Sequence, residues 1–231
     1  MAVRIAPAMT PDDRLAALHA RIASAARPAR RDPADVTLIA VSKTHPADAI
    51  RPLLLAGQRD FGENRVQEAQ EKWPALREEF ADFRLHLVGQ LQSNKAADAV
   101  ALADAIHSVD RSSLIAALAR AMDATGRRPD CFVQVNIGAE EQKGGCAIAD
   151  VPALLAEARS AALPIVGLMC VPPAGIEPAP YFALLAKIAR DHGIAGLSMG
   201  MSEDVEQAVS LGATHVRVGS ALFGHRQGTP A

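Results

Sequence analysis

A lysine follows the first buried strand that the sequence predicts. The apolar residues 38–41 end at Ser42 and Lys43, and a turn containing Pro46 comes next. A bounded apolar run of this length predicts a buried strand, and a lysine is rarely fully buried unless another group pairs with it. At the open end of such a strand, desolvation lowers the pKa of the ammonium, and the neutral amine can condense with an aldehyde. The alternative is a lysine whose stem lies along the strand while its charge reaches water.

Two glycine-containing turns later in the chain have the composition of an anion site. Ser202 closes a Gly-Met-Ser turn before a helix expected to begin near Glu203, and Gly219-Ser220 precedes the short apolar segment 221–224. Glycine allows a close backbone approach, and the free N–H groups at a helix start favour anions. Ser202 could instead be only a helix cap. The second glycine–serine turn favours phosphate binding over that simpler interpretation.

Arg217 alternates with Val216 and Val218, so its side chain points to the opposite face of the strand. If that face is the interior of the fold, a buried guanidinium needs an anionic or acceptor partner, such as a phosphate or a ring nitrogen. The alternative is an outward arginine that binds a carboxylate on a helix.

The elements that must position these residues form a regular series. Thr10 and Pro11 predict the start of a helix over residues 10–26, with an apolar stripe at Leu15, Leu18 and Ile22. Eight apolar strands then follow, at residues 36–42, 59–62, 84–89, 105–109, 131–137, 165–170, 196–199 and 215–218. Helices are expected between them, at residues 46–56, 63–73, 94–102, 111–125, 150–162, 178–192 and 203–211, with a short one after Gly219.

Strict alternation of eight strands and helices predicts a single α/β domain over residues 1–231, a (β/α)8 TIM barrel at 36–226 preceded by the helix. An open doubly wound sheet is the rival, but it usually has a glycine-rich turn after its first strand, and Lys43 stands there instead. Barrel sites form at the carboxyl ends of the strands. A phosphate site facing a reactive lysine suits pyridoxal 5′-phosphate, or a sugar phosphate held by a Schiff-base aldolase.

Composition excludes several other classes of function. The formal net charge of −2 gives no basic field for nucleic acid or an anionic membrane. The three cysteines have no metal-ligand spacing, and no cluster of carboxylates and histidines suggests a metal site. No apolar segment reaches the length of a membrane span, and no secretory leader is evident in residues 1–9. These features predict a cytoplasmic protein with reduced thiols.

Seven motifs in the same order resemble the family of pyridoxal phosphate homeostasis proteins, over about residues 10–226. They are Val41-Ser42-Lys43-Thr44, Phe61-Gly62-Glu63-Asn64, the His86–Lys95 segment HLVGQLQSNK, Val135-Asn136-Ile137, Gly167-Leu168-Met169, Gly200-Met201-Ser202 and the Val216–Gly224 segment VRVGSALFG. The resemblance implies an alanine-racemase-like barrel that holds pyridoxal phosphate as an internal aldimine on Lys43. It further implies a cofactor site that includes Asn64, Met199, Ser202, Arg217, Gly219 and Ser220.

Members of this family are regarded as cofactor-binding regulators of vitamin B6 and amino-acid balance, generally without a demonstrated enzymatic reaction. The related racemases carry a second domain that supplies a catalytic tyrosine and completes a dimeric site. The single tyrosine here, Tyr181, is expected to pack within a helix, and no second acid or base stands out for racemisation. We therefore expect a monomer that buffers pyridoxal phosphate or delivers it to apoenzymes. The alternative is a low-activity pyridoxal phosphate-dependent amino-acid racemase or related enzyme.

Overall fold

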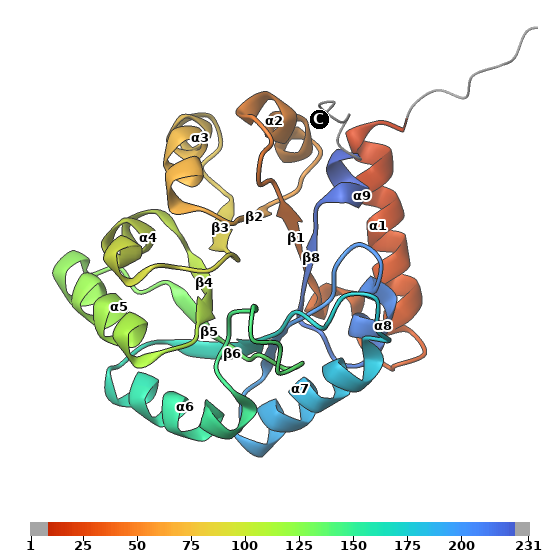
Figure 1. Cartoon of the computed structure of the whole chain (residues 1–231). Coiled ribbons are helices and arrows are strands. Elements are labelled where there is room, and N and C mark those ends of the chain that lie inside the picture. Colours follow the sequence, from red (N-terminus) through yellow and green to blue (C-terminus); the bar gives the residue numbers. More distant parts are fainter. Residues whose placement is uncertain (1–8, 225–231) are drawn as a thin grey trace, which may run out of the picture.

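Eight parallel strands close into a barrel in chain order in the computed structural model, which describes residues 9–224 (Figure 1). The strands are β1 (Thr37–Val41), β2 (Asp60–Glu63), β3 (Arg84–Leu87), β4 (Ala105–Val109), β5 (Asp130–Gln134), β6 (Ile165–Met169), β7 (Gly196–Ser198) and β8 (His215–Val218). The pairing of Leu38 with Val216 joins β1 to β8 and closes the ring. The barrel prediction is confirmed and the open sheet is wrong; the last two residues of the predicted barrel, 225 and 226, lie outside the described range.

Helices surround the barrel. They are α1 (Pro11–Ala26), α2 (Ala47–Leu55), α3 (Val66–Glu79), α4 (Ala96–Leu102), α5 (Ser112–Thr125), α6 (Val151–Ser160), α7 (Ala179–Asp191), α8 (Val205–Ser210) and α9 (Ser220–Phe223), with short 3-10 turns at Pro33–Asp35, Ser93–Lys95 and Ile148–Asp150. The predicted helix at 63–73 is misplaced, because Glu63 ends β2 and the helix runs on through Pro74 to Glu79. Trp73 and Leu76 are both fully buried on one face of α3, and this packing favours the longer helix.

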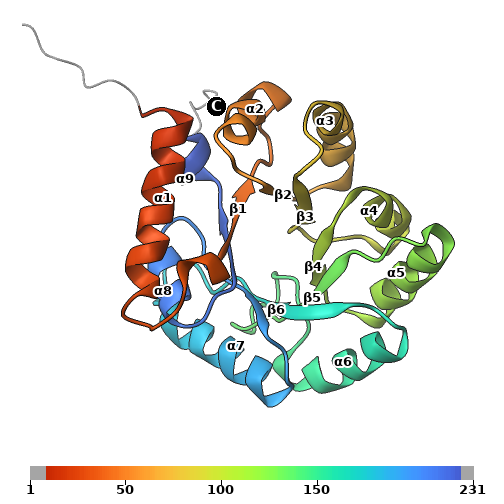
Figure 2. The ribbon, with the colours of Figure 1, turned by 180° about the vertical axis from the view of Figure 1, so that it is seen from behind.

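The N-terminal helix α1 covers the seam between β8 and β1. Thr10 and Asp13 form the reciprocal capping hydrogen bonds, and Leu15, Leu18 and Ile22 are buried, as the sequence predicts. Figures 1 and 2 show α1 lying along α8 and α9. Arg21 of α1 forms an ion pair with Glu206 of α8 and donates to a backbone carbonyl before that helix. The helix therefore holds α8 and the turn that follows β7 in place.

The barrel interior contains polar rings as well as aliphatic groups. His86 and His107 are both buried. The His107 ring stacks on Phe132 with ring centroids 4.1 Å apart. His215 meets Phe132 edge-on at 5.0 Å. A Cβ at Gly167 would lie 2.3 Å from atoms of the Phe132 ring, so glycine is required where this aromatic stack fills the barrel.

The stability of the fold should depend on pH through His215. Burial lowers the pKa of His215 from 6.5 to about 4, whereas an unfolded chain takes up this proton near its ordinary value. Between these two values the unfolded state binds more protons, so the free energy of unfolding falls as the pH is lowered. We expect His215→Asn to remove about 2 kcal/mol of the stability difference between pH 7 and pH 5. Urea unfolding at both pH values measures this difference, and the same change in the free energy of unfolding for wild type and variant would contradict the prediction. The control is His19→Asn, at an exposed position on α1.

The three cysteine thiols are buried, and no helix in the described part of the chain could span a bilayer. Cys131, Cys146 and Cys170 are free and buried, and burial raises the pKa of each thiol to about 12. Such thiols are poor nucleophiles. Over the described range, no helix combines the length and apolar character that a bilayer crossing requires.

Candidate functional site

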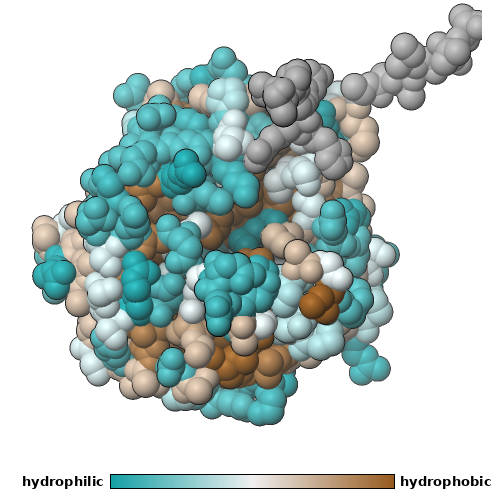
Figure 3. Space-filling view, in the orientation of Figure 1, coloured by the Kyte–Doolittle hydropathy of each residue, from teal (hydrophilic) through white to brown (hydrophobic). Residues whose placement is uncertain are grey.

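A cavity of about 710 Å³ opens at the carboxyl ends of the strands. Six of the seven residues predicted for the site line it: Lys43, Asn64, Ser202, Arg217, Gly219 and Ser220. Figure 3 shows the hollow near the middle of this face, with both hydrophilic and hydrophobic residues around it. The volume falls within the range of about 300–1,000 Å³ that small-molecule sites commonly have.

Lys43 projects from a tight turn at the end of β1. The His45 N–H donates to the Ser42 carbonyl at 3.0 Å, which closes the turn around Lys43 and Thr44. Thr44 has a φ of +65°, a conformation that a β-branched residue rarely adopts. The lysine side chain is exposed at the cavity, so the expectation that burial at the strand end desolvates it is wrong. Within the described residues its ammonium makes no hydrogen bond or ion pair, and it is free to meet a ligand.

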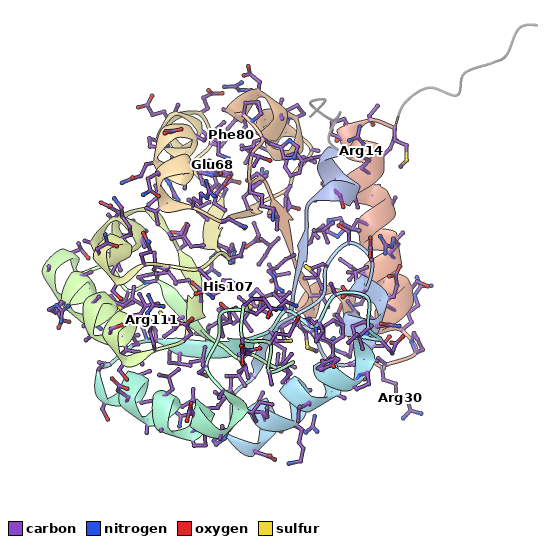
Figure 4. All side chains as sticks on the ribbon, viewed as in Figure 1. Arg14, Arg30, Glu68, Phe80, His107 and Arg111 are labelled. Carbon is purple, nitrogen blue, oxygen red and sulfur yellow. The ribbon has the colours of Figure 1, made fainter. Side chains whose placement is uncertain are left out.

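A second lysine holds this turn from behind. The Lys72 ammonium on α3 donates to the carbonyl of Ser42 at 3.0 Å and to that of His45 at 3.1 Å. It also pairs with Glu68, whose carboxylate accepts the Thr44 N–H. Figure 4 shows Glu68 on α3, outside the ring of strands. The strained turn thus depends on contacts from α3, which keep Lys43 directed at the cavity.

Glu63, at the end of β2, completes the support. Its carboxylate lies 2.7 Å from the Lys72 ammonium and accepts hydrogen bonds from the Ser42 hydroxyl at 2.7 Å and the Trp73 indole at 3.1 Å. The side chain is fully buried, and burial raises the pKa of the carboxyl above its usual value despite these partners. Lys72 therefore stabilises a buried charge as well as the turn.

The two predicted serines meet on the wall of the cavity. The Ser220 hydroxyl donates to the Ser202 hydroxyl at 3.1 Å. The helix expected near Glu203 begins at Val205, so Ser202 stands in a turn and is not the cap of α8. The Ser202 carbonyl is held by Arg21 at 3.0 Å, which fixes the turn to α1. Gly219 brings its strand end close to β1, where a Cβ would lie 3.2 Å from the Val41 carbonyl.

Arg217 lies inside the barrel, and the outward alternative is wrong. The side chain is 6 % exposed and donates to the Ser198 hydroxyl at 2.7 Å and to the Cys170 carbonyl at 2.9 Å. In the described part of the chain it forms no hydrogen bond or ion pair with a carboxylate, and burial lowers the pKa of the guanidinium although the charge of Asp204 acts in the opposite direction. A buried cation with only neutral acceptors, at the base of a cavity, favours an anionic ligand.

Met199 does not reach the cavity. It is fully buried and packs in the aliphatic core. Its side chain does not line the cavity, and its part in cofactor binding stays a prediction. The predicted site left out His45, which also lines the cavity. His45 lies two residues after Lys43 in the same turn, and this proximity could have predicted its place at the cavity. Nothing in the sequence pointed to the contribution of Lys72.

A closed parallel barrel with a lysine after β1 and paired serines after β7 and β8 defines an alanine-racemase-like barrel. The family model for the alanine racemase N-terminal domain matches residues 14–227. The chain belongs to this family, and within it to the pyridoxal phosphate homeostasis proteins. The protein of that name from Pseudomonas aeruginosa is 42 % identical over 228 residues, covering 95 % of this chain and 97 % of the relative. The Escherichia coli protein of the same name is 36 % identical over 222 residues, covering 92 % and 95 %.

Solved structures agree with this assignment. PipY of Synechococcus elongatus without pyridoxal phosphate is 41 % identical and superposes with a TM-score of 0.82, covering 92 % of this chain and 99 % of PipY. The PipY structure with pyridoxal phosphate bound is 40 % identical, with a TM-score of 0.80 and coverage of 93 % and 100 %. An alanine racemase of Clostridium difficile is 16 % identical with a TM-score of 0.70, covering 94 % of this chain and 58 % of the racemase. This last likeness concerns the fold alone.

Proposed function

We propose that the protein binds pyridoxal 5′-phosphate in the cavity and takes part in its homeostasis. The observation that carries the proposal is the arrangement of the Lys43 amine, the Ser202–Ser220 pair and the buried Arg217 guanidinium around one cavity. The PipY structure with pyridoxal phosphate bound supports it, as do the names of the relatives.

The residues fit the chemistry of this cofactor. Pyridoxal phosphate supplies an aldehyde, with which an amine condenses to an imine and water. Lys43 offers the amine, and the hydroxyls of Ser202 and Ser220 offer donors to a phosphate. Arg217 adds a fixed positive charge, and Asn64 supplies a neutral amide on the wall. Gly219 lets the backbone approach closely at the serine side of the cavity.

The geometry suits storage and release better than protected catalysis. Lys43 is exposed at the cavity, so water can reach the covalent link and hydrolyse it. Carbanion chemistry needs the opposite, a closed site that excludes water. We therefore propose that the protein buffers the cofactor or passes it to apoenzymes, as a cytoplasmic monomer. Size-exclusion chromatography coupled to light scattering tests the monomer, and transfer to a pyridoxal phosphate-free aminotransferase tests delivery.

The absorption spectrum of the protein mixed with pyridoxal phosphate tests the main proposal. We expect an imine band that borohydride removes, and a reduced pyridoxyl group on the peptide containing Lys43. The racemase alternative predicts rapid exchange of the α-proton of an amino acid in deuterated water. Absence of the imine band, or attachment at another lysine, would show that the cavity has a different ligand.

Removing both serine hydroxyls should weaken retention of the cofactor more than removing either one. Each hydrogen bond to a phosphate contributes about 1.5–3 kcal/mol, so we expect Ser202→Ala with Ser220→Ala to raise the Kd by at least about 100-fold. Equilibrium dialysis measures the effect, and Ser160→Ala, on the exposed surface of α6, is the control. Unchanged occupancy in the double variant would refute the phosphate assignment.

A further inference from the structure

A chain of polar side chains, buried except for the partly exposed Asp60, crosses the barrel from the cavity to the opposite end. Arg217 donates to the Ser198 hydroxyl at 2.7 Å, and this hydroxyl lies 2.9 Å from His107 Nδ1. His107 Nε2 lies 3.0 Å from His86 Nδ1, and His86 Nε2 lies 2.9 Å from an Asp60 carboxylate oxygen. These residues come from β8, β7, β4, β3 and β2, and Figure 4 shows His107 in the middle of the barrel.

The interior of such a barrel is usually filled by bulky aliphatic side chains. Here Ser198 and His107 are fully buried and His86 is 1 % exposed. Burying these polar groups is costly unless each is hydrogen-bonded, and a complete network can fix one arrangement. Of the five residues, only Arg217 lines the cavity. The other four therefore need a role other than direct contact with a ligand.

The two ends of the chain together favour one direction for its hydrogen bonds, because a guanidinium can only donate and an ionised carboxylate can only accept. A guanidinium can only donate, so the Ser198 oxygen accepts from Arg217 and its own proton is free to be donated to His107 Nδ1. His107 then carries its proton on Nε2 and donates it to His86 Nδ1. His86 carries its proton on Nε2 and donates it to the Asp60 carboxylate. Every proton has an acceptor, and both imidazoles are neutral.

The reversed arrangement is less favourable. It would place a proton on His107 Nδ1, leave the Ser198 hydroxyl proton without an acceptor in the chain, and require His86 to be an imidazolium or Asp60 to be protonated. An imidazolium would add a second buried positive charge near Arg217. Burial lowers the pKa of His107 well below its usual value, with His86, His215 and Arg217 acting in the same direction. His215 faces both rings from β8, 6.0 Å from His107 and 6.2 Å from His86.

We infer that Asp60, His86, His107 and Ser198 form a positioning chain that fixes the guanidinium of Arg217 at the base of the cavity, with both imidazoles held as Nε2–H tautomers. The Cys170 carbonyl fixes the second arm of the guanidinium at 2.9 Å. With these two contacts set, the remaining N–H donors of Arg217 keep a constant direction for an anionic ligand group. The effect on a ligand rests on the proposed binding of pyridoxal phosphate, whereas the tautomers of the two histidines are independent of it.

The tautomers can be observed directly by long-range proton–nitrogen NMR of histidine-labelled protein at pH 7.5. We expect His86 and His107 to give the signature of neutral rings protonated on Nε2, with signals assigned from His86→Gln and His107→Gln spectra. An Nδ1–H tautomer or an imidazolium at either residue would overturn the inference. This readout does not use the cofactor, so it stands even if the protein fails to bind pyridoxal phosphate.

The positioning effect is tested from the end of the chain that is remote from the cavity. Asp60→Leu removes the final acceptor, and Asp60→Asn keeps an oxygen there. We expect the leucine variant to show mixed tautomers and a Kd for pyridoxal phosphate raised about fivefold or more, and the asparagine variant to stay within about twofold of wild type. Equal affinity and unchanged tautomers in both variants would refute the positioning role. If Asp60→Leu does not fold, Ser198→Ala tests the same point, because it interrupts the chain next to Arg217. We expect it to weaken binding similarly, while Lys43 still reacts at saturating cofactor.

Discussion

Replacing Lys72 with methionine should lower the free energy of unfolding by about 3–5 kcal/mol. The Lys72 ammonium lies 2.7 Å from Glu63, whose side chain is fully buried, and the methionine leaves that carboxylate without a cation. The same change removes the donors that hold the Ser42 and His45 carbonyls on either side of Lys43. Urea unfolding at pH 7 measures the loss, and borohydride fixation at low cofactor concentration reports the disturbed turn.

The pH dependence of this loss identifies its cause. Without Lys72, the pKa of Glu63 should rise further, and the native state then binds a proton that the unfolded state has released. Stability therefore falls as the pH rises, and Lys72→Met should be less destabilising at pH 5 than at pH 8. Adding Glu63→Gln removes the uncompensated charge and should restore more than half of the loss. A double variant as unstable as Lys72→Met would mean that packing, and not the buried charge, explains the effect.

The position of the site could be predicted because parallel strands in a barrel place all their carboxyl ends on one face. Once eight strands were recognised, Lys43 and Ser220 had to meet on that face, although 177 positions separate them in the 231-residue chain. The exact ends of the strands were harder to predict from the sequence. The fifth strand ends at Gln134 and not at 137, because Val135 makes only an isolated bridge with Cys146.

Contacts made by side chains from other elements could not be predicted. The spacing of Glu68 and Lys72 indicates an ion pair on a helix, but not that Lys72 reaches two carbonyls of the β1 turn. The sequence suggested only a ligand as the partner of Arg217, and the structure adds the Ser198 hydroxyl. The alternation of side chains along a strand could have been applied to Met199 as well. It places Met199 on the face opposite Ser198, away from the cavity.

The turn at Lys43 shows how local cost and tertiary support combine. Thr44 adopts a left-handed φ that glycine would adopt without strain, at a cost of about 1–3 kcal/mol. A network of buried polar groups on α3 and β2 offsets this cost, and the result is a lysine held at the cavity while its own ammonium remains unpaired within residues 9–224. Such an arrangement keeps the amine available without burying it.

Replacing Lys43 with arginine should abolish covalent attachment of pyridoxal phosphate while leaving weaker binding. Arginine keeps the positive charge, but its guanidinium does not form a stable imine, so the imine band and the borohydride-fixed product should fall to background. The serine hydroxyls and Arg217 remain and still bind the phosphate-bearing ligand. Lys43→Ala removes the charge as well, so any difference in Kd between the two variants measures the electrostatic part of the interaction.

The matched control is Lys187→Ala, which removes a lysine on α7 that pairs with Asp191 at 2.6 Å, away from the cavity. Its fixation by borohydride should equal that of wild type. Mass analysis of the fixed peptides distinguishes the outcomes, since a pyridoxyl group on another lysine in Lys43→Arg would place the reactive amine elsewhere. Because Lys43 is the lysine that the β1 turn and α3 together direct into the cavity, we expect no stoichiometric product from that variant.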